Sequence, residues 1–284
     1  MTTSSQPVST DFTLGFIGGG HMASAIVTGL MLEGFAAERI WISEPSCEQR
    51  NALSSRFSGV HVTANNSELT DHCDAVVLAV KPQVMAAVCG ALSLQDQESL
   101  PVVVSIAAGV RTDSIVGWLG ARQPVVRAMP NQGAAARLST TGLYANDSCS
   151  REQRNQAETI MRAVGSVVWV DEEIDIDAIT AVAGSGPAYL YYLMEVMQQA
   201  AEQLGLSSTV ARQLAVETAQ AASVLAQSDD ETLAALRARV TSPGGTTAAA
   251  LEFMQANNFA GILTGAINEA HARAAQLADA AAKD

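Results

Sequence analysis

Residues 14–25 read LGFIGGGHMASA, and this stretch decides the fold of the first half of the chain. Its opening residues are mostly apolar and predict a short buried strand. Gly18, Gly20 and Ala23 then follow in the G-x-G-x-x-A spacing of a dinucleotide-binding turn. Gly18 permits a tight turn, Gly20 lets the backbone approach a pyrophosphate, and Ala23 lets the next helix pack closely against the strand. The N–H groups at the start of that helix would face the phosphates.

One acidic residue supports this interpretation of the turn. The next apolar run, residues 40–43, ends at Glu44, close to the separation of about 20 residues at which a carboxylate binds the ribose of a dinucleotide. Two plainer interpretations stay open. The motif is also compatible with an ordinary glycine-rich turn, and Glu44 with an exposed carboxylate at the start of a helix.

Strand and helix patterns alternate over the first 130 residues. Further apolar runs predict strands at 60–62, 75–80, 101–105 and 124–128, and a final helix–strand pair is expected at 150–170. From the helix expected at 46–57, Cys47, Leu53 and Phe57 would face inward. The alternation predicts an α/β fold with a doubly wound parallel sheet.

Ligands of such sheets bind beyond the carboxyl ends of the strands. The residues that follow the strands are therefore the candidate contacts, and they lie at 18–22, 43–44, 81–82, 106–108 and 129–131. Lys81 is a cation at the end of an otherwise apolar strand. It is either a lysine at the rim of the sheet or a contact to cofactor or substrate. His21 lies in the glycine turn, where its backbone rather than its imidazole would make contact.

The composition changes at Asp171, where strand patterns stop and Ala, Leu, Gln and Glu become frequent. We therefore expect a dinucleotide-binding domain at 12–170 and an all-helical domain at 171–284. Residues 184–187, GSGP, form a corner between helices, which is also a possible ligand contact. The helix expected at 207–227 is almost uncharged on two faces, so it is buried within its own domain or against a second subunit.

A second glycine-rich segment, residues 240–247, reads VTSPGGTT and precedes an alanine-rich helix. Ser-Pro-Gly-Gly does not continue a helix, and Thr246 and Thr247 lie where the N-cap and first-turn residues belong. Free N–H groups, two hydroxyls and a helix dipole converge there on one small volume, which would attract a carboxylate or phosphate. The alternative is a plain helix cap.

The overall composition disfavours several classes of partner. The 284 residues carry a formal net charge of −13, which would repel nucleic acids and anionic membranes. No apolar stretch is long enough to span a bilayer, no signal peptide is evident, and residues 1–11 would be a frayed tail. The four scattered cysteines indicate reduced thiols in a cytoplasmic protein. The four histidines lack the spacing of a metal site or a catalytic triad, so no metal is expected.

Six stretches of the chain, taken together, resemble the Δ1-pyrroline-5-carboxylate reductase family. They are FIGGGHMASAI, AVKPQVM, VVSIAAGV, RAMPN, AVAGSGPAYLYY and VTSPGGTT, in the family's order between residues 12 and 275. The resemblance implies a Rossmann domain and an all-helical domain that interlocks with its twin in a homodimer, with a decamer of five dimers as a larger assembly. It also implies reduction of the C=N bond of L-1-pyrroline-5-carboxylate, a cyclic imine carboxylate, to L-proline by NADPH or NADH, the last step of proline biosynthesis.

The same resemblance implies roles for individual residues. Thr247 and Lys81 would be catalytic, since the Thr247 hydroxyl would relay a proton to the imine nitrogen and Lys81 would border the nicotinamide and the substrate. Arg239 stands where the family commonly has Asn or Gln, and Asp230 where Glu is common. The substrate would contact Gly245, Thr246, Thr247, Lys81, Arg239 and Asp230. The cofactor would contact Ile17, Gly18, Gly19, Gly20, His21, Met22, Ser43, Glu44, Asn66, Ala79, Val80, Lys81, Pro82, Ile106, Ala107 and Ala108.

Glu44 departs from the pattern of the family members that prefer NADPH. Those members often carry a small hydroxyl residue or a basic residue near this position, and a carboxylate there would repel the 2′-phosphate. Ser43, Ser46 and Arg50 remain as alternative phosphate ligands. We therefore expect NADH to be used at least competitively.

Two other classes of function stay open. A β-hydroxyacid dehydrogenase also combines a Rossmann domain with helices, but it needs a catalytic lysine on the first long helix of the second domain, and residues 187–206 contain none. An NAD(P)-sensing binding module would use its helical half only for oligomerisation, and it would bind the cofactor without turnover.

Overall fold

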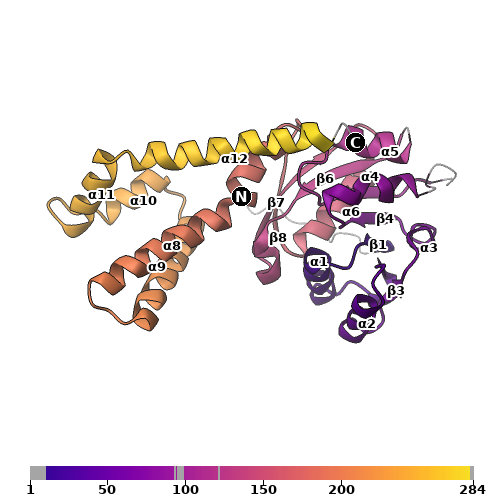
Figure 1. Cartoon of the computed structure of the whole chain (residues 1–284), viewed down its shortest axis with the longest axis horizontal. Helices are drawn as coiled ribbons and strands as arrows, with labels where there is room; N and C mark the ends of the chain where they lie inside the picture. The colour runs from indigo at the N-terminus through magenta and orange to yellow at the C-terminus, as the bar shows by residue number, and fades with distance from the viewer. Residues whose placement is uncertain (1–10, 93, 95–98, 121, 282–284) are drawn as a thin grey trace. The chain divides into compact units, whose positions relative to one another are not determined.

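The computed structural model describes residues 11–281 with the exception of 93, 95–98 and 121. Apart from Asp11, the tail expected at 1–11 lies outside the described residues. By its internal contacts the chain forms two units (Figure 1). The sheet unit comprises Met1–Gly184 and Ala270–Asp284, and the helical unit comprises Ser185–Glu269.

Within the described residues, eight strands form one sheet in the order β3-β2-β1-β4-β5-β6-β7-β8. Their bounds are β1 Leu14–Ile17, β2 Ile40–Ser43, β3 His61–Thr63, β4 Ala75–Leu78, β5 Val102–Ser105, β6 Val125–Met129, β7 Ser139–Ala145 and β8 Gly165–Trp169. All neighbours pair in parallel except β6 and β7, which are antiparallel. The predicted doubly wound α/β sheet is confirmed, with one antiparallel step.

The antiparallel strand β7 is the one strand that the sequence patterns do not predict. Its segment reads STTGLYA, and its polar residues hide the strand. Ser139 and Thr141 are nevertheless buried, and their hydroxyl oxygens lie 3.2 Å apart. The Ser139 hydroxyl also accepts a hydrogen bond from the backbone N–H of Asn131. Because these hydroxyls are hydrogen-bonded, burying them costs little, and a polar strand fits inside the sheet.

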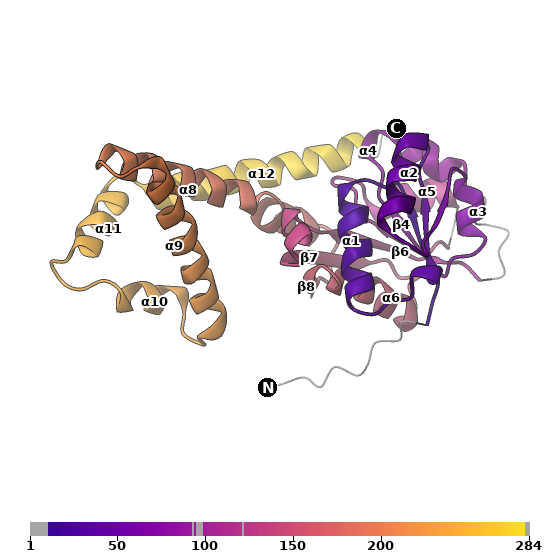
Figure 2. The ribbon, with the colours of Figure 1, turned by 90° about the horizontal axis from the view of Figure 1, so that it is seen from below.

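Helices cover both faces of the sheet, so the sheet unit has three layers (Figure 2). One face packs against α1 His21–Leu32, α2 Cys47–Arg56 and α6 Arg151–Arg162. The other packs against α3 Asn66–Thr70, α4 Pro82–Gly90 and α5 Thr112–Leu119. Successive residues of β4 alternate between the two cores, with Val77 in the first and Val76 in the second. Both faces of the central strands are therefore buried, which explains their continuous apolar runs.

Short helical turns complete the sheet unit. They are the 3₁₀ turns η1 Ala37–Arg39 and η2 Gln132–Ala136, helix α7 Asp175–Ile179, and the π-helix η3 Thr180–Gly184. The last two follow β8 and lead to Ser185, where the helical unit begins.

Cys47 does not face inward, as the sequence pattern predicts. Leu53 and Phe57 are buried, but Cys47 is exposed. Cys47 and Leu53 are six positions apart, so the two side chains point about 120° apart around the helix axis. A residue at that position lies outside the buried stripe.

The helical unit contains α8 Gly186–Gln203, α9 Ser208–Ser228, α10 Leu233–Arg239, α11 Thr246–Ala256 and the first part of α12 Phe259–Ala281. Pro187 lies in the first turn of α8, and Gly205 follows that helix with φ of +95°, as expected for a helix start and stop. The short helix α10 is not predicted by the sequence pattern. The last turns of α12 belong to the sheet unit, where Ala274 and Ala278 are buried.

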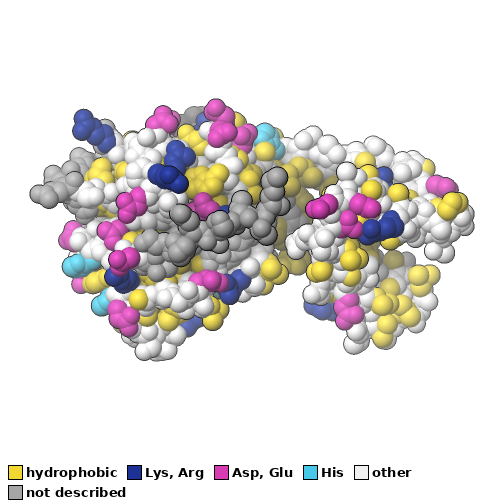
Figure 3. Space-filling model, turned by 180° about the vertical axis from the view of Figure 1, so that it is seen from behind, with side chains coloured by type: hydrophobic (Ala, Val, Ile, Leu, Met, Phe, Trp, Pro, Cys, Tyr) yellow, Lys and Arg dark blue, Asp and Glu magenta, His cyan; other side chains and the backbone are white. Residues whose placement is uncertain are grey.

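Large apolar side chains are exposed on the helical unit (Figure 3). In α9, Ala211 and Ala215 are buried, whereas Leu214, Val224 and Leu225 are 49%, 56% and 57% exposed. Monomeric proteins rarely leave large apolar patches in water. Of the two expectations for this helix, burial within its own domain is wrong, and burial against a second subunit fits. Among the described helices, none combines the length and apolar character needed to cross a bilayer.

The cysteines provide a test of this packing. Burial raises the pKa of the Cys73 and Cys89 thiols to about 12 and that of Cys149 to about 11. Because the thiolate is the reactive form, these three groups resist alkylation at pH 8, whereas the exposed Cys47 reacts. Peptide mapping after iodoacetamide treatment of the folded protein should find Cys47 alone, and unfolding in urea should release all four. Fast labelling of Cys73 or Cys89 in the folded protein would contradict the packing.

Candidate functional site

The glycine turn after β1 approaches the end of β4 very closely. Gly18 has φ of +102° and donates its N–H to the carbonyl oxygen of Ser43 at 2.8 Å. A Cβ atom on Gly18 would lie 2.9 Å from the carbonyl oxygen of Ala79. Both the backbone angle and this contact require glycine.

The start of α1 faces open space. Gly20 is the N-cap residue and provides no side-chain cap, so the first N–H groups of α1 have no side-chain acceptor on that residue. A Cβ atom on Gly20 would meet no heavy atom within 4 Å. The turn therefore presents a helix start with room for a ligand, which is the arrangement that binds phosphate.

Glu44 caps backbone N–H groups at the same place. Its Oε2 accepts a hydrogen bond from the N–H of Gly19 at 3.1 Å, and its Oε1 accepts one from the N–H of Ser46 at 3.0 Å. Gln49 adds a hydrogen bond from Nε2 to the carbonyl oxygen of Gly19 at 3.0 Å. The carboxylate is thus bound to the glycine turn itself rather than free at a helix start.

The other residues considered for phosphate binding already have partners within the chain. The buried Ser43 hydroxyl donates to Oδ1 of Asn66 at 2.6 Å. The Ser46 hydroxyl accepts from the N–H of Gln49, as the N-cap of α2. A guanidinium nitrogen of Arg50 donates to the carbonyl oxygens of Glu44 and Pro45, both at 2.8 Å. These contacts leave the other guanidinium nitrogens of Arg50 and the O–H of Ser46 as possible donors to a 2′-phosphate.

The loops after β4 and β5 lie beside the glycine turn, because β1 pairs with β4 and β4 pairs with β5. The N–H of Ala79 donates to the carbonyl oxygen of Ile17 at 2.9 Å, and the N–H of Ile106 donates to that of Leu78 at 3.3 Å. Lys81 is exposed as the N-cap of α4, with Pro82 in the first turn. The sheet thus brings together the predicted contacts at 17–22, 43–44, 79–82 and 106–108.

Apart from Lys81, the predicted substrate contacts lie in the helical unit. Gly245 is the N-cap of α11, so Thr246 and Thr247 occupy its first turn. The expectation that a threonine caps this helix is wrong, because the chain enters the helix one residue earlier. Arg239 forms ion pairs with Asp229 at 3.0 Å and Glu231 at 3.6 Å. Hydrogen bonds from the N–H of Glu231 and from Arg239 hold the pKa of Asp229 below its usual value.

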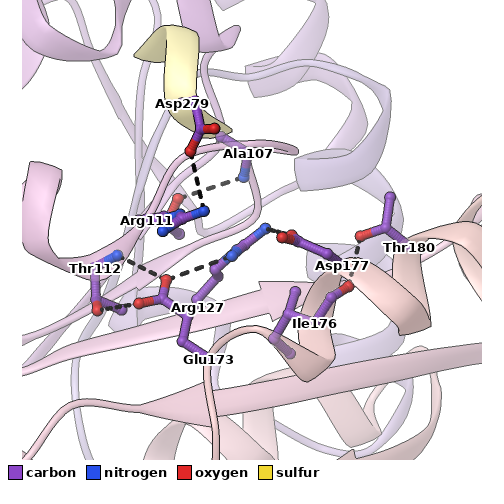
Figure 4. Close-up of polar contacts among 10 residues, drawn as sticks. Ala107, Arg111, Thr112, Arg127, Glu173, Ile176, Asp177, Thr180 and Asp279 are labelled. Atoms are coloured by element: carbon purple, nitrogen blue, oxygen red, sulfur yellow. Dashed lines mark hydrogen bonds and ion pairs between the residues drawn. The ribbon is translucent and has the colours of Figure 1, made fainter. Parts of the chain in front are cut away.

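The sequence patterns did not predict a buried ionic cluster in the sheet unit, which links β6, the start of α5 and the segment after β8 (Figure 4). Arg127 in β6 is 2% exposed and donates to Oδ1 of Asp177 at 2.8 Å and to Oε1 of Glu173 at 3.5 Å. Glu173 also accepts hydrogen bonds from the N–H and the hydroxyl of Thr112, both at 2.8 Å. The available signal was an arginine inside an otherwise apolar strand, VVRAM. Within the described residues, no group of three or more His, Cys, Asp or Glu is placed to hold a metal ion.

Comparison with known proteins agrees with this geometry. Residues 13–109 match the family model described as NADP oxidoreductase coenzyme F420-dependent, and residues 173–277 match the model described as pyrroline-5-carboxylate reductase dimerisation. A doubly wound sheet with a glycine turn at its carboxyl edge, together with the first match, defines an NAD(P)-dependent oxidoreductase of the Rossmann type. The second match identifies the helical half as a dimerisation domain.

Relatives extend over almost the whole chain. The pyrroline-5-carboxylate reductase of Pseudomonas aeruginosa is 45% identical over 268 residues, which cover 94% of this chain and 97% of that protein. The chain belongs to the pyrroline-5-carboxylate reductase family. The solved structure from Coxiella burnetii is 41% identical, with a TM-score of 0.89 over 94% of this chain and 98% of that one. The Plasmodium falciparum enzyme, solved with NADP bound, is 25% identical, with a TM-score of 0.82 over 95% and 99%.

Proposed function

We propose how the residues of this chain reduce L-1-pyrroline-5-carboxylate to L-proline, the last step of proline biosynthesis. The observation that carries the proposal is the identity of 45% to a pyrroline-5-carboxylate reductase over 94% of the chain. The glycine turn, Lys81 and the Pro-Gly-Gly-Thr-Thr segment all lie within the part of the chain that aligns with that relative. Residues 12–170 bind the cofactor, and residues 171–284 bind the substrate and form the dimer.

The cofactor lies along the carboxyl edge of the sheet. Its pyrophosphate binds at residues 18–22, where α1 begins without a side-chain cap and Gly20 faces open space. Glu44 accepts a hydrogen bond from the ribose, and Asn66 and the backbone at 79–82 and 106–108 line the remainder of the site. Bound NADH or NADPH supplies the hydride.

The substrate carboxylate binds at Gly245, Thr246 and Thr247, the start of α11, where the helix dipole favours an anion. Because the N–H of Gly245 donates to the carbonyl oxygen of Ser242 at 3.0 Å, the N–H groups of Thr246 and Thr247 are the backbone donors. Hydride addition to the C=N carbon leaves an electron pair on nitrogen, so the nitrogen must carry or receive a proton. The Thr247 hydroxyl relays that proton. Lys81 borders the reacting ring, and Arg239 and Asp230 border the substrate.

The enzyme is a homodimer through its helical unit, supported by the exposed apolar side chains of α9. Five dimers assemble into a decamer, as the resemblance to the family implies. The free thiols and the net charge of −13 support a cytoplasmic location without nucleic acid or membrane partners.

The paired threonines test the substrate site. We expect the protein to form one proline for each NADH consumed from pyrroline-5-carboxylate. The double variant Thr246→Ala, Thr247→Ala should lower kcat/KM about 100-fold, because it removes the proton relay of Thr247 and the Thr246 hydroxyl at the anion site. Thr241→Ala is the matched control, since the Thr241 hydroxyl donates to the Arg237 carbonyl within the chain. A double variant that makes proline as fast as the parent protein would contradict the assignment of these threonines to the substrate site. A parent protein that binds NADH without turnover would favour an NAD(P)-sensing module.

The pair Gly20→Ala and Gly18→Ala tests the cofactor turn. Gly20→Ala should leave Tm close to that of the parent, because its Cβ meets nothing within 4 Å, yet raise the Kd for NADH about 10-fold by occupying the pyrophosphate space. Gly18→Ala should instead lower Tm, because of its φ of +102°. Calorimetry and fluorescence titration measure both quantities. An unchanged Kd for Gly20→Ala would move the pyrophosphate away from this turn.

Glu44 determines the choice between NADH and NADPH. Its carboxylate repels a 2′-phosphate by about 1 kcal/mol or more, so kcat/KM for NADPH should exceed that for NADH by less than about 100-fold. Glu44→Ser should raise this ratio about 10-fold, whereas Glu48→Ser, in the exposed first turn of α2, should not change it. Steady-state kinetics with NADH and with NADPH measure this ratio for the parent protein and for each variant. A parent ratio above about 100 would contradict this role.

A further inference from the structure

Two neighbouring sets of charged and polar contacts lie at the far end of the loop between β5 and α5 (Figure 4). In one set, Arg111 forms an ion pair with Asp279 of α12 at 3.2 Å. The next residue, Thr112, is held by Glu173, and Glu173 and Asp177 bind the two sides of the Arg127 guanidinium. We name Thr112, Glu173 and Arg127 the loop anchor.

The loop at residues 106–111 is held at both ends and from behind. At its first end, the N–H of Ile106 donates to the Leu78 carbonyl, and the N–H of Ala107 donates to the Ser105 hydroxyl at 3.4 Å. At its far end, Glu173 accepts the N–H of Thr112. Behind it, Gly109 packs so closely on α12 that a Cβ atom would lie 2.8 Å from the Cβ of Leu277. Displacement of Glu173 would release the far end.

Glu173 is itself positioned by a buried charge. The side chains of Arg127 and Asp177 are 2% and 1% exposed, so neither moves without leaving a charge unpaired in a medium of low dielectric. Oδ2 of Asp177 is buried without a partner among the described residues, so the carboxylate depends on Arg127. The guanidinium thereby ties the position of Glu173 to the central strand β6.

Residues next to the anchor bond the sheet unit to the two segments by which the chain leaves and re-enters this unit. Asp177 lies in α7, which leads through the π-helix η3 to Gly184, the last residue before the helical unit. A side-chain N–H of Asn131, at the end of β6, donates to the carbonyl oxygen of Ala183 in η3 at 2.9 Å. Asp279, which pairs with Arg111, lies in the part of α12 that belongs to the sheet unit. Both segments are therefore bonded to the sheet near the end of this loop.

We propose that Thr112, Glu173 and Arg127 are positioning residues for hydride transfer, which act by holding the loop at residues 106–111 in place. The inference rests on the proposed function, which assigns Ile106, Ala107 and Ala108 to the cofactor. The proposed function assigns none of the anchor residues to the cofactor or the substrate. They fix the backbone against which the cofactor is oriented, and small errors in orientation slow a reaction strongly.

The matched pair Thr112→Val and Thr112→Ser tests this role. Thr112→Val keeps the shape of the side chain but removes the hydroxyl that donates to Glu173, and Thr112→Ser retains it. We expect Thr112→Val to slow single-turnover hydride transfer about 10-fold and to increase the kinetic isotope effect with deuterated NADH, whereas Thr112→Ser restores the parent rate. Glu173→Gln should behave like Thr112→Val.

Exposed ion pairs provide a second comparison. Arg111→Gln removes the pair with Asp279, and Arg39→Gln removes the similarly exposed pair with Asp11 on another part of the sheet unit. The first variant should weaken NADH binding, and the second should not. A parent protein that neither binds NADH nor consumes the imine would contradict the proposed function itself. An active parent whose Thr112→Val and Glu173→Gln variants lose Tm but keep the parent isotope effect would overturn the inference alone.

Discussion

The buried guanidinium of Arg127 is the constraint on which the arrangement of the sheet unit depends. A charge that is 2% exposed loses almost all of its hydration, and the chain offsets this loss with two carboxylates from the segment after β8. Neutralising one arginine therefore fixes α7 against β6. Because Glu173 also accepts two hydrogen bonds from Thr112, the same charge fixes the start of α5.

Contacts within the chain hold the glycine turn at the carboxyl edge of the sheet. Gly18 packs against Ala79, and Glu44 and Gln49 bind the backbone of Gly19. A turn that is already ordered loses little entropy when a ligand binds, so this preorganisation favours affinity. Glu44 supports the turn through its hydrogen bond from Gly19, and in the proposed function the same carboxylate disfavours a 2′-phosphate.

Local patterns were enough to predict most of the fold. The spacing of Gly18 and Gly20 and the continuous apolar run of β4 depend on neighbouring residues, so they are visible in the sequence. The pairing of Arg127 with Asp177 joins residues 50 positions apart, and no local pattern shows it. Strand β7 was missed because its sequence is polar. Its buried hydroxyls are tolerated because they form hydrogen bonds, which depend on the tertiary structure.

The candidate site likewise has features that local sequence patterns predict and features that depend on tertiary packing. The predicted contacts at 18–22, 81–82 and 106–108 follow from the rule that ligands bind where parallel strands end. The sequence did not show that Ser43, Ser46 and Arg50 have partners within the chain, because those hydrogen bonds depend on tertiary packing. Helix α9 shows a further case, in which the sequence predicted burial in the domain or against a second subunit, and the exposed apolar side chains favour the second subunit.

Amide hydrogen exchange with and without saturating NADH tests the central claim most directly, namely that the cofactor binds at this edge of the sheet unit. Exchange should slow at residues 18–22, 79–82 and 106–111 when NADH binds. Saturation of the protein with NADH while these three segments exchange at their unliganded rates would contradict the account.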